Sequence, residues 1–70
     1  MIRQQVSSSC IRSIGYEAIT SILEIEFVNG TVYRYLDVPM YKHHELMRAS
    51  SHGTYFNAEI KDVYRSIKHH

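Results

Sequence analysis

The dipeptide Asn29-Gly30 constrains this chain most, because it is typical of a tight β-hairpin when alternating segments flank it. Residues 22–28 before it alternate between two sides. One side is apolar (Leu23, Ile25, Phe27) and the other is acidic (Glu24, Glu26). Residues 31–36 after it are rich in β-branched and aromatic side chains. The sequence therefore predicts two half-buried antiparallel strands joined at Asn29-Gly30.

The length of the hairpin loop decides which face Tyr33 and Tyr35 occupy, because a shift of one residue exchanges the two faces of a strand. A two-residue loop pairs Ile25 with Arg34 and places a charge in the apolar face. A three-residue loop, with Gly30 in the left-handed conformation, pairs Ile25 with Tyr33 and leaves Arg34 beside the two glutamates. Burying an unpaired guanidinium costs several kcal/mol. We therefore predict the three-residue loop, with both tyrosines on the core face.

The remaining segments predict the other elements of a small α+β domain. Residues 10–16 are predicted to form a further strand. Pro39 is placed at the first position of a helix that covers the sheet, and Ser51 is expected to cap a second short helix. Residues 63–67 fit either a strand or a continued helix, and residues 1–7 are expected to be flexible. The prediction is a three-stranded antiparallel meander with two short helices on one face, forming a single domain over residues 8–67.

Size and composition limit what such a domain can do. The chain has 70 residues and one cysteine, Cys10, so no intramolecular disulfide can support its small core. Self-association is the remaining support, and we expect a homo-oligomer that pairs through an edge strand such as residues 10–16. The net charge of +1 lacks the excess of a duplex-DNA binder. No apolar stretch predicts a membrane span or a secretion signal, and a single free thiol favours the cytoplasm.

Residues Ser51, His52, Gly53 and Thr54 are the candidate anion-binding segment. A serine cap followed by glycine leaves backbone N–H groups with little side-chain bulk above them, and a helix start attracts phosphate or carboxylate. Protonated His52 would add a charge, and Arg34 and Arg12 are the candidate counter-charges. The alternative is a capped turn between helices in which glycine serves only close packing.

Tyrosines are the second group of candidate binding residues. Tyr33 and Tyr35 on an open sheet face would form a stacking platform for nucleobases. The preferred hairpin register instead buries both under the helix that begins at Pro39, which favours a core role. Tyr16 and Tyr55 are the other candidates, because six tyrosines exceed what so small a core can hide.

Metal binding and catalysis have little support in the sequence. His43 and His44 are adjacent and lie about 100° apart on a helix, whereas metal ligands on one helix stand three or four residues apart. His43 is expected to face the core with a hydrogen-bond partner. Glu24 and Glu26 stand beside Arg34, which predicts an ion pair rather than an acid and base flanking a substrate. We therefore expect neither a metal nor another cofactor, and no enzyme.

The chain resembles the KTSC domain family from about residue 8 to residue 64. The family's hallmark Tyr-x-Tyr corresponds to Tyr33 and Tyr35. The ordered elements that carry the resemblance are Ser8-Ser9, Ile14-Gly15-Tyr16, Leu23-x-Ile25-x-Phe27, Asn29-Gly30, Tyr33-x-Tyr35, Val38-Pro39, Leu46, Ala49, Ser51-x-Gly53, Tyr55-Phe56-Asn57 and Ile60. The family takes its name from the C-terminus of some lysyl-tRNA synthetases and also occurs as free-standing proteins, so the resemblance implies RNA as a ligand. This chain departs from the pattern at His43, where an aromatic residue is expected, and at His52, where a lysine or arginine is expected.

Two classes of function are consistent with these observations. The first is a non-enzymatic binding module for RNA or a small phosphate-bearing nucleotide, with an exposed tyrosine for stacking. The second is a protein–protein or self-association module without a nucleic-acid ligand.

Overall fold

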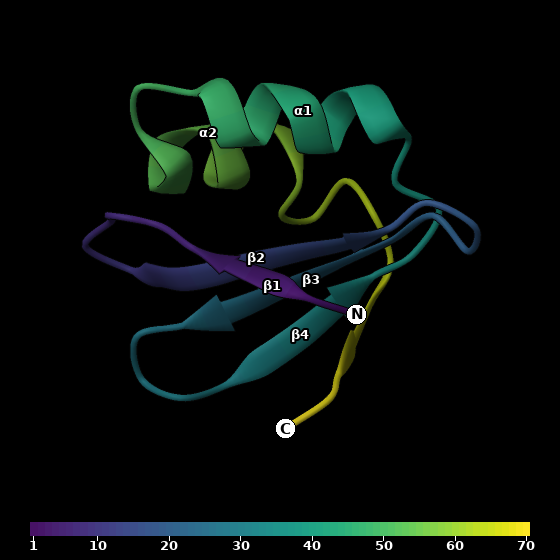
Figure 1. Ribbon diagram of the computed structural model, residues 1–70, viewed down its shortest axis with the longest axis horizontal. Coiled ribbons are helices and arrows are strands. Elements are labelled where there is room, and N and C mark those ends of the chain that lie inside the picture. The colour runs from purple at the N-terminus through teal and green to yellow at the C-terminus, as the bar shows by residue number, and fades with distance from the viewer.

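The computed structural model describes residues 1–70 and has two layers, a β-sheet and a pair of helices on one of its faces (Figure 1). The sheet contains five antiparallel strands in chain order. They are β1 (Arg3–Gln5), β2 (Ile11–Glu17), β3 (Ile22–Phe27), β4 (Val32–Tyr35) and β5 (Ser66–Lys68). Helices α1 (Met40–Arg48) and α2 (His52–Glu59) connect β4 to β5. The fold is α+β, as the sequence predicts.

The hairpin between β3 and β4 has the predicted three-residue loop. Ile25 lies opposite Tyr33, and Leu23 lies opposite Tyr35. Gly30 has a φ of 93°, a conformation that residues with a Cβ rarely adopt. The register therefore places both tyrosines on the same face as the apolar side chains of β3.

The predicted number of strands was wrong, because the sheet has one additional strand on each side. Strand β1 forms within residues 1–7, which were expected to be flexible, and β5 forms in the tail, for which the sequence fits either a strand or a helix. Strand β2 consequently pairs with a neighbour on both sides. The expectation that residues 10–16 form an open edge was therefore also wrong, and the edges are β1 and β5.

Gly15 accounts for the position of β1. A Cβ on Gly15 would lie 2.8 Å from Cγ of Arg3, so the glycine leaves room for the Arg3 side chain to cross β2. Arg3 reaches the Glu24 carboxylate at 3.1 Å, and Nε of Arg34 donates to the same carboxylate from β4 at 2.8 Å. Glu24 is only 6% exposed. A buried carboxylate between two guanidinium groups thus links β1, β3 and β4 on the sheet face without helices.

The core lies between the helices and the other face of the sheet. It consists of Ile11, Ile14, Leu23, Ile25, Tyr35, Val38, Leu46, Phe56 and Ile60. Helix α2 packs on Tyr35 of β4, since the ring of Phe56 lies 5.4 Å from that of Tyr35, while Tyr33 is only half-buried. Helix α1 packs instead over β2, where His43 stacks on Tyr16 at 4.9 Å. The expectation that the first helix buries both tyrosines was wrong, because the two helices share the face and α1 occupies the β2 side.

The helix starts are partly as predicted. Ser51 caps α2, because its Oγ accepts a hydrogen bond from the Thr54 N–H at 3.2 Å. Pro39 has an extended ψ of 150° and is the residue before α1 rather than its first residue. The helix therefore begins one position later than the sequence predicts. Neither helix has the length and apolar character needed to cross a lipid bilayer.

Substitutions of Gly30 test the hairpin loop. A Cβ there would meet no atom within 4 Å, so the cost of Gly30→Ala comes from the backbone alone. We expect this change to lower the free energy of unfolding by about 1–2 kcal/mol. Gly30→Asn should cost less, because asparagine tolerates positive φ better than alanine. Urea unfolding of the two variants measures the difference in the free energy of unfolding. Equal losses in the two variants would show that the positive φ of Gly30 is not the cause.

Candidate functional site

The predicted anion-binding segment, residues 51–54, forms the first turn of α2. The Ser51 hydroxyl accepts from the Thr54 N–H and also lies 2.9 Å from the Thr54 hydroxyl. His52 Nδ1 donates to the Leu46 carbonyl at 2.9 Å, so its side chain turns back toward α1. The polar side chains of this turn therefore bond within the protein. Anion binding by its backbone amides stays a prediction.

Gly53 is a point of close packing between α2 and the segment before β2. Gly53 is buried, and a Cβ at this position would lie 2.8 Å from Sγ of Cys10. The glycine thus allows α2 to approach the cysteine. Close packing is the alternative role for this glycine that the sequence analysis gives beside an anion-binding role.

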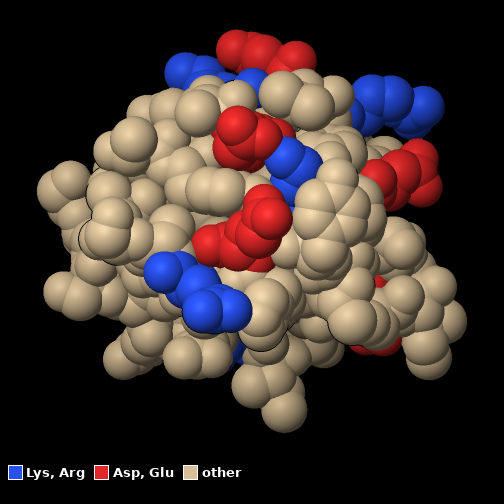
Figure 2. Space-filling model, turned by 90° about the horizontal axis from the view of Figure 1, so that it is seen from above, with Lys and Arg blue, Asp and Glu red and all other residues tan.

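The predicted counter-charges do not lie beside this turn. Arg34 alternates with two tyrosines that face the helices, so its side chain lies on the opposite face, where it binds Glu24. Arg12 donates to the Val28 carbonyl at 2.9 Å and lies 3.7 Å from the Glu26 carboxylate. On the side of the molecule seen in Figure 2, acidic and basic groups are interspersed and form no extended patch of one sign. The structure therefore does not bring the predicted phosphate-binding residues together.

Two of the candidate tyrosines have hydrogen-bond partners within the protein. The Tyr16 hydroxyl donates to the Val38 carbonyl at 2.6 Å, and the stacked His43 ring is partly buried, which lowers the pKa of that histidine. The His43 side chain forms no hydrogen bond within the protein, so the expected hydrogen-bond partner was wrong, and the ring stacks on Tyr16 instead. The Tyr55 hydroxyl donates to Glu45 at 2.5 Å, and burial together with this bond raises the pKa of Tyr55 to about 12.

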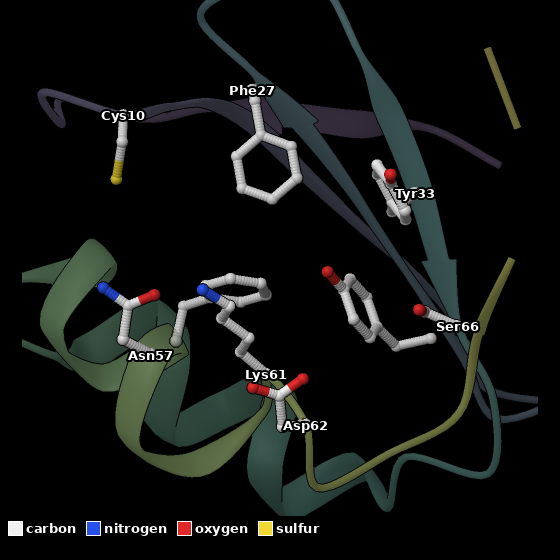
Figure 3. A pocket seen from close by; sticks show the side chains of 9 residues that line it. Cys10, Phe27, Tyr33, Asn57, Lys61, Asp62 and Ser66 are labelled. Carbon is white, nitrogen blue, oxygen red and sulfur yellow. The ribbon is translucent and has the colours of Figure 1, made fainter. Parts of the chain in front are cut away.

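Tyr33 and Tyr35 lie in a different environment, the wall of a cavity of about 430 Å³ between the sheet and α2 (Figure 3). Phe27 and Tyr33 point into it from the sheet, and Lys61 and Asp62 point into it from the segment after α2. Its nine lining residues are Cys10, Phe27, Tyr33, Tyr35, Phe56, Asn57, Lys61, Asp62 and Ser66. The pair is therefore neither an open platform nor wholly part of the core.

Four aromatic rings form the apolar part of this cavity. The Phe56 ring meets Phe27 at 5.5 Å and Tyr35 at 5.4 Å, both edge to face. Tyr33 lies 6.2 Å from Phe27 and 6.4 Å from Tyr35. Phe27 and Tyr33 are half-buried, whereas Phe56 and Tyr35 are buried. The two half-buried rings leave aromatic surface available to a ligand.

The hydroxyl group of Tyr35 has no hydrogen-bond partner in the protein. Tyr35 is 6% exposed as a residue, but no fully buried side-chain oxygen of the structure lacks a partner, so this hydroxyl reaches the open part of the cavity. Burial raises the pKa of Tyr35 to about 12, and the nearby Tyr33 and Asp62 contribute to this shift. The hydroxyl is therefore neutral at physiological pH and available to bond a ligand in the cavity.

Charged and polar side chains surround the outer part of the cavity. Lys61, Asp62, Asn57 and Ser66 are exposed. The four ion pairs of the structure use other residues, so neither Lys61 nor Asp62 has a charged partner. No three His, Cys, Asp or Glu side chains are grouped as metal ligands. The cavity offers aromatic surface, one cation, one carboxylate and several hydrogen-bonding groups, which suits a ligand that is both planar and polar.

The sequence points to the two tyrosines of this cavity but not to most of its other residues. The hairpin register already places Phe27 on the face of Tyr33 and Tyr35, which was a usable signal. Nothing in the sequence places Lys61 and Asp62 there, because they join the cavity only through the way α2 packs on the sheet.

Comparison with known proteins identifies relatives of nearly the whole chain. A model of the KTSC domain matches residues 7–64. The crystal structure of a KTSC domain protein from Yersinia pestis is 43% identical and covers 99% of this chain and 97% of its own, with a TM-score of 0.94. An uncharacterized protein of Stutzerimonas stutzeri is 43% identical over 61 residues, which are 87% of this chain and 86% of that protein.

A second kind of relative is much longer than this chain. A lysine–tRNA ligase of Trichormus variabilis is 40% identical over 57 residues, which are 81% of this chain but 10% of the ligase. A lysine–tRNA ligase of Nostoc punctiforme is 40% identical over a segment of the same length. The chain thus corresponds to a small part of these enzymes.

A double-mutant cycle tests the contact between Gly53 and Cys10. Gly53→Ala is expected to destabilise the protein by about 1 kcal/mol, because the added methyl group would overlap Sγ of Cys10. In a Cys10→Ala background the same change should be neutral or stabilising, since alanine favours helix over glycine by up to ~1 kcal/mol. Urea unfolding of the four proteins gives the coupling energy, and additive effects would contradict the contact.

Proposed function

The chain belongs to the KTSC domain family, and we propose that it is a small non-enzymatic module that binds RNA or a phosphate-bearing nucleotide, with a nucleobase in the aromatic cavity. The observation that carries this proposal is the combination of half-buried aromatic rings with the unbonded hydroxyl of Tyr35 in one open cavity. A base supplies what the cavity lacks, namely a planar ring to stack and an edge that forms hydrogen bonds.

The size and lining of the cavity are consistent with a base as ligand. Its volume of about 430 Å³ lies within the range of small-molecule sites, roughly 300–1,000 Å³. Stacking on an aromatic side chain such as Tyr33 contributes about 1–3 kcal/mol per base in proteins that bind single strands. A ligand of this kind would also offer the Tyr35 hydroxyl a hydrogen-bond partner in place of water.

Lys61 is the residue that we assign to the phosphate. Its ammonium group has no ion-pair partner, and its side chain points into the cavity (Figure 3). A cation beside an aromatic surface suits a nucleotide, because base and phosphate then bind at neighbouring points. The small net charge favours a single nucleotide or a short single strand over a duplex.

The relatives provide independent support for RNA. Lysine–tRNA ligases carry a segment similar to this chain, and their name identifies tRNA as a substrate of the whole enzyme. A cytoplasmic location is part of the proposal, since a reducing compartment keeps the single Cys10 thiol free.

A titration followed by amide resonances tests this function. Adding mononucleotides and a short single-stranded RNA should shift the resonances of the cavity residues. Tyr35→Phe keeps the ring and removes the hydroxyl, so it should weaken binding about two- to tenfold. Tyr41→Phe, at a tyrosine that is 58% exposed on α1 and outside the cavity, is the matched control and should bind as the wild type does.

Two outcomes would contradict the proposed function. The first is the absence of any shift at the cavity residues at millimolar concentrations of every ligand. The second is a set of shifts confined to residues 51–54, which would assign binding to the predicted anion site instead of the cavity.

Self-association is the second candidate, and the edges of the sheet favour it. Strands β1 and β5 each leave one side unpaired, and Ile2 and Ile67 beside or within them are 91% and 56% exposed. Unpaired edges with exposed apolar side chains are suited to pairing with another copy.

A measurement of the oligomeric state tests whether the protein self-associates. We expect a mass above 8.2 kDa at micromolar concentration, measured by light scattering. Replacing Ile2 with lysine should lower the measured mass, whereas the same replacement of Ile19, 93% exposed in the β2–β3 turn, should not. A monomeric mass across a wide concentration range would exclude self-association.

A further inference from the structure

We propose that the cavity selects guanine among the bases, with the Asp62 carboxylate accepting hydrogen bonds from the ligand. This inference rests on the proposed function and specifies its ligand. It depends on the position of Asp62, on its lack of a partner, and on the donors that each base presents.

Asp62 carries a negative charge just after the end of a helix and has no partner in the protein. It follows the C-terminus of α2, where the helix dipole disfavours negative charge. Its φ is 63°, in the left-handed region, which aspartate and asparagine adopt more readily than most other residues with a Cβ. It forms no ion pair and no side-chain hydrogen bond that would offset the effect of the helix dipole. No protein group therefore occupies the acceptors of this exposed carboxylate, and a ligand would replace only water there.

The Asp62 carboxylate is exposed and points toward the aromatic cavity. Figure 3 shows the Asp62 side chain directed from the segment after α2 toward the space bordered by Phe27 and Tyr33. Its charge also acts on the hydroxyl of Tyr35, so an acceptor and a neutral hydroxyl border the same space. A base stacked on the rings would present its edge to these two groups.

Guanine fits this pair of groups better than the other bases do. Its Watson–Crick edge places two neighbouring N–H donors beside a carbonyl acceptor. A carboxylate, which has only acceptors, takes both donors, and the Tyr35 hydroxyl donates to the carbonyl. Adenine presents a ring-nitrogen acceptor where guanine has a donor, and that nitrogen would face the carboxylate without a hydrogen bond. Hypoxanthine lacks the amino group, so it loses one of the two bonds.

The Asp62→Asn variant changes this chemistry while retaining the shape of the side chain. Asparagine also enters the left-handed region readily, so the turn after α2 should form as before. The amide has one acceptor and gains a donor. It therefore matches xanthine, which has an N–H beside a carbonyl where guanine has an N–H beside an amino group.

Asp37 provides a matched control within the same chain. It is also an exposed aspartate with a left-handed φ, of 56°, and it lies outside the cavity. Asp37→Asn removes the same charge at the same backbone conformation without altering the ligand site.

The experiment measures the affinities of the monophosphates of guanosine, inosine, xanthosine and adenosine for the wild type and both variants. The wild type should bind the guanosine nucleotide about tenfold or more tightly than the other three. Asp62→Asn should lose this preference and gain affinity for the xanthosine nucleotide, a gain that a misfolded variant would not show. Asp37→Asn should keep the preference of the wild type.

The possible failures are distinguishable. If the wild type binds all four nucleotides in the cavity with equal affinity, the selection of guanine is wrong and the proposed function stands. If Asp62→Asn keeps the preference for guanine, Asp62 is not the acceptor and this inference is wrong. If none of the four binds at millimolar concentration, this inference is wrong, and if the short single-stranded RNA does not bind in the cavity either, the proposed function is wrong as well.

Discussion

The register of the β3–β4 hairpin determines the character of both faces of the sheet. A loop of three residues ending in Gly30 sets Leu23 and Ile25 opposite Tyr35 and Tyr33. Because side chains alternate along a strand, this single choice gives the sheet an apolar face rich in aromatic rings and a polar face. The helices pack on the first face, and the ion pairs form on the second.

The polar face is stabilised by charge rather than by an apolar layer. Glu24 accepts from Arg34 on the neighbouring strand and from Arg3 across β2, and Gly15 provides the room for the second contact. A buried carboxylate with two guanidinium partners is costly to break, because either partner's loss leaves a poorly compensated charge. The short strand β1 is held by this network together with its backbone pairing to β2.

The cavity arises because two short helices do not fill the apolar face. Helix α1 packs over β2 and contributes Leu46 and His43, while Phe56 of α2 meets Phe27 and Tyr35. The space between α2 and β4 remains open to solvent and is lined by Tyr33, Lys61 and Asp62 among others. The rings that build the core thus also form the wall of the candidate site, so changes that remove a ring would affect folding and binding together. Substitutions that change a single polar group and keep the rings intact can alter binding without altering folding.

Local patterns in the sequence were sufficient to predict the α+β class, the hairpin register, the pairing of Arg34 with Glu24 and the capping of α2 by Ser51. Each depends on neighbours along the chain or directly across a hairpin, where alternation and turn chemistry are sufficient. The folded chain was needed to show that β1 and β5 extend the sheet and that Lys61 and Asp62 join the tyrosines. Strand β1 depends on the space above Gly15, and the site depends on where α2 lies on the sheet. Both are packing relations between distant segments, which leave no periodic pattern in the sequence.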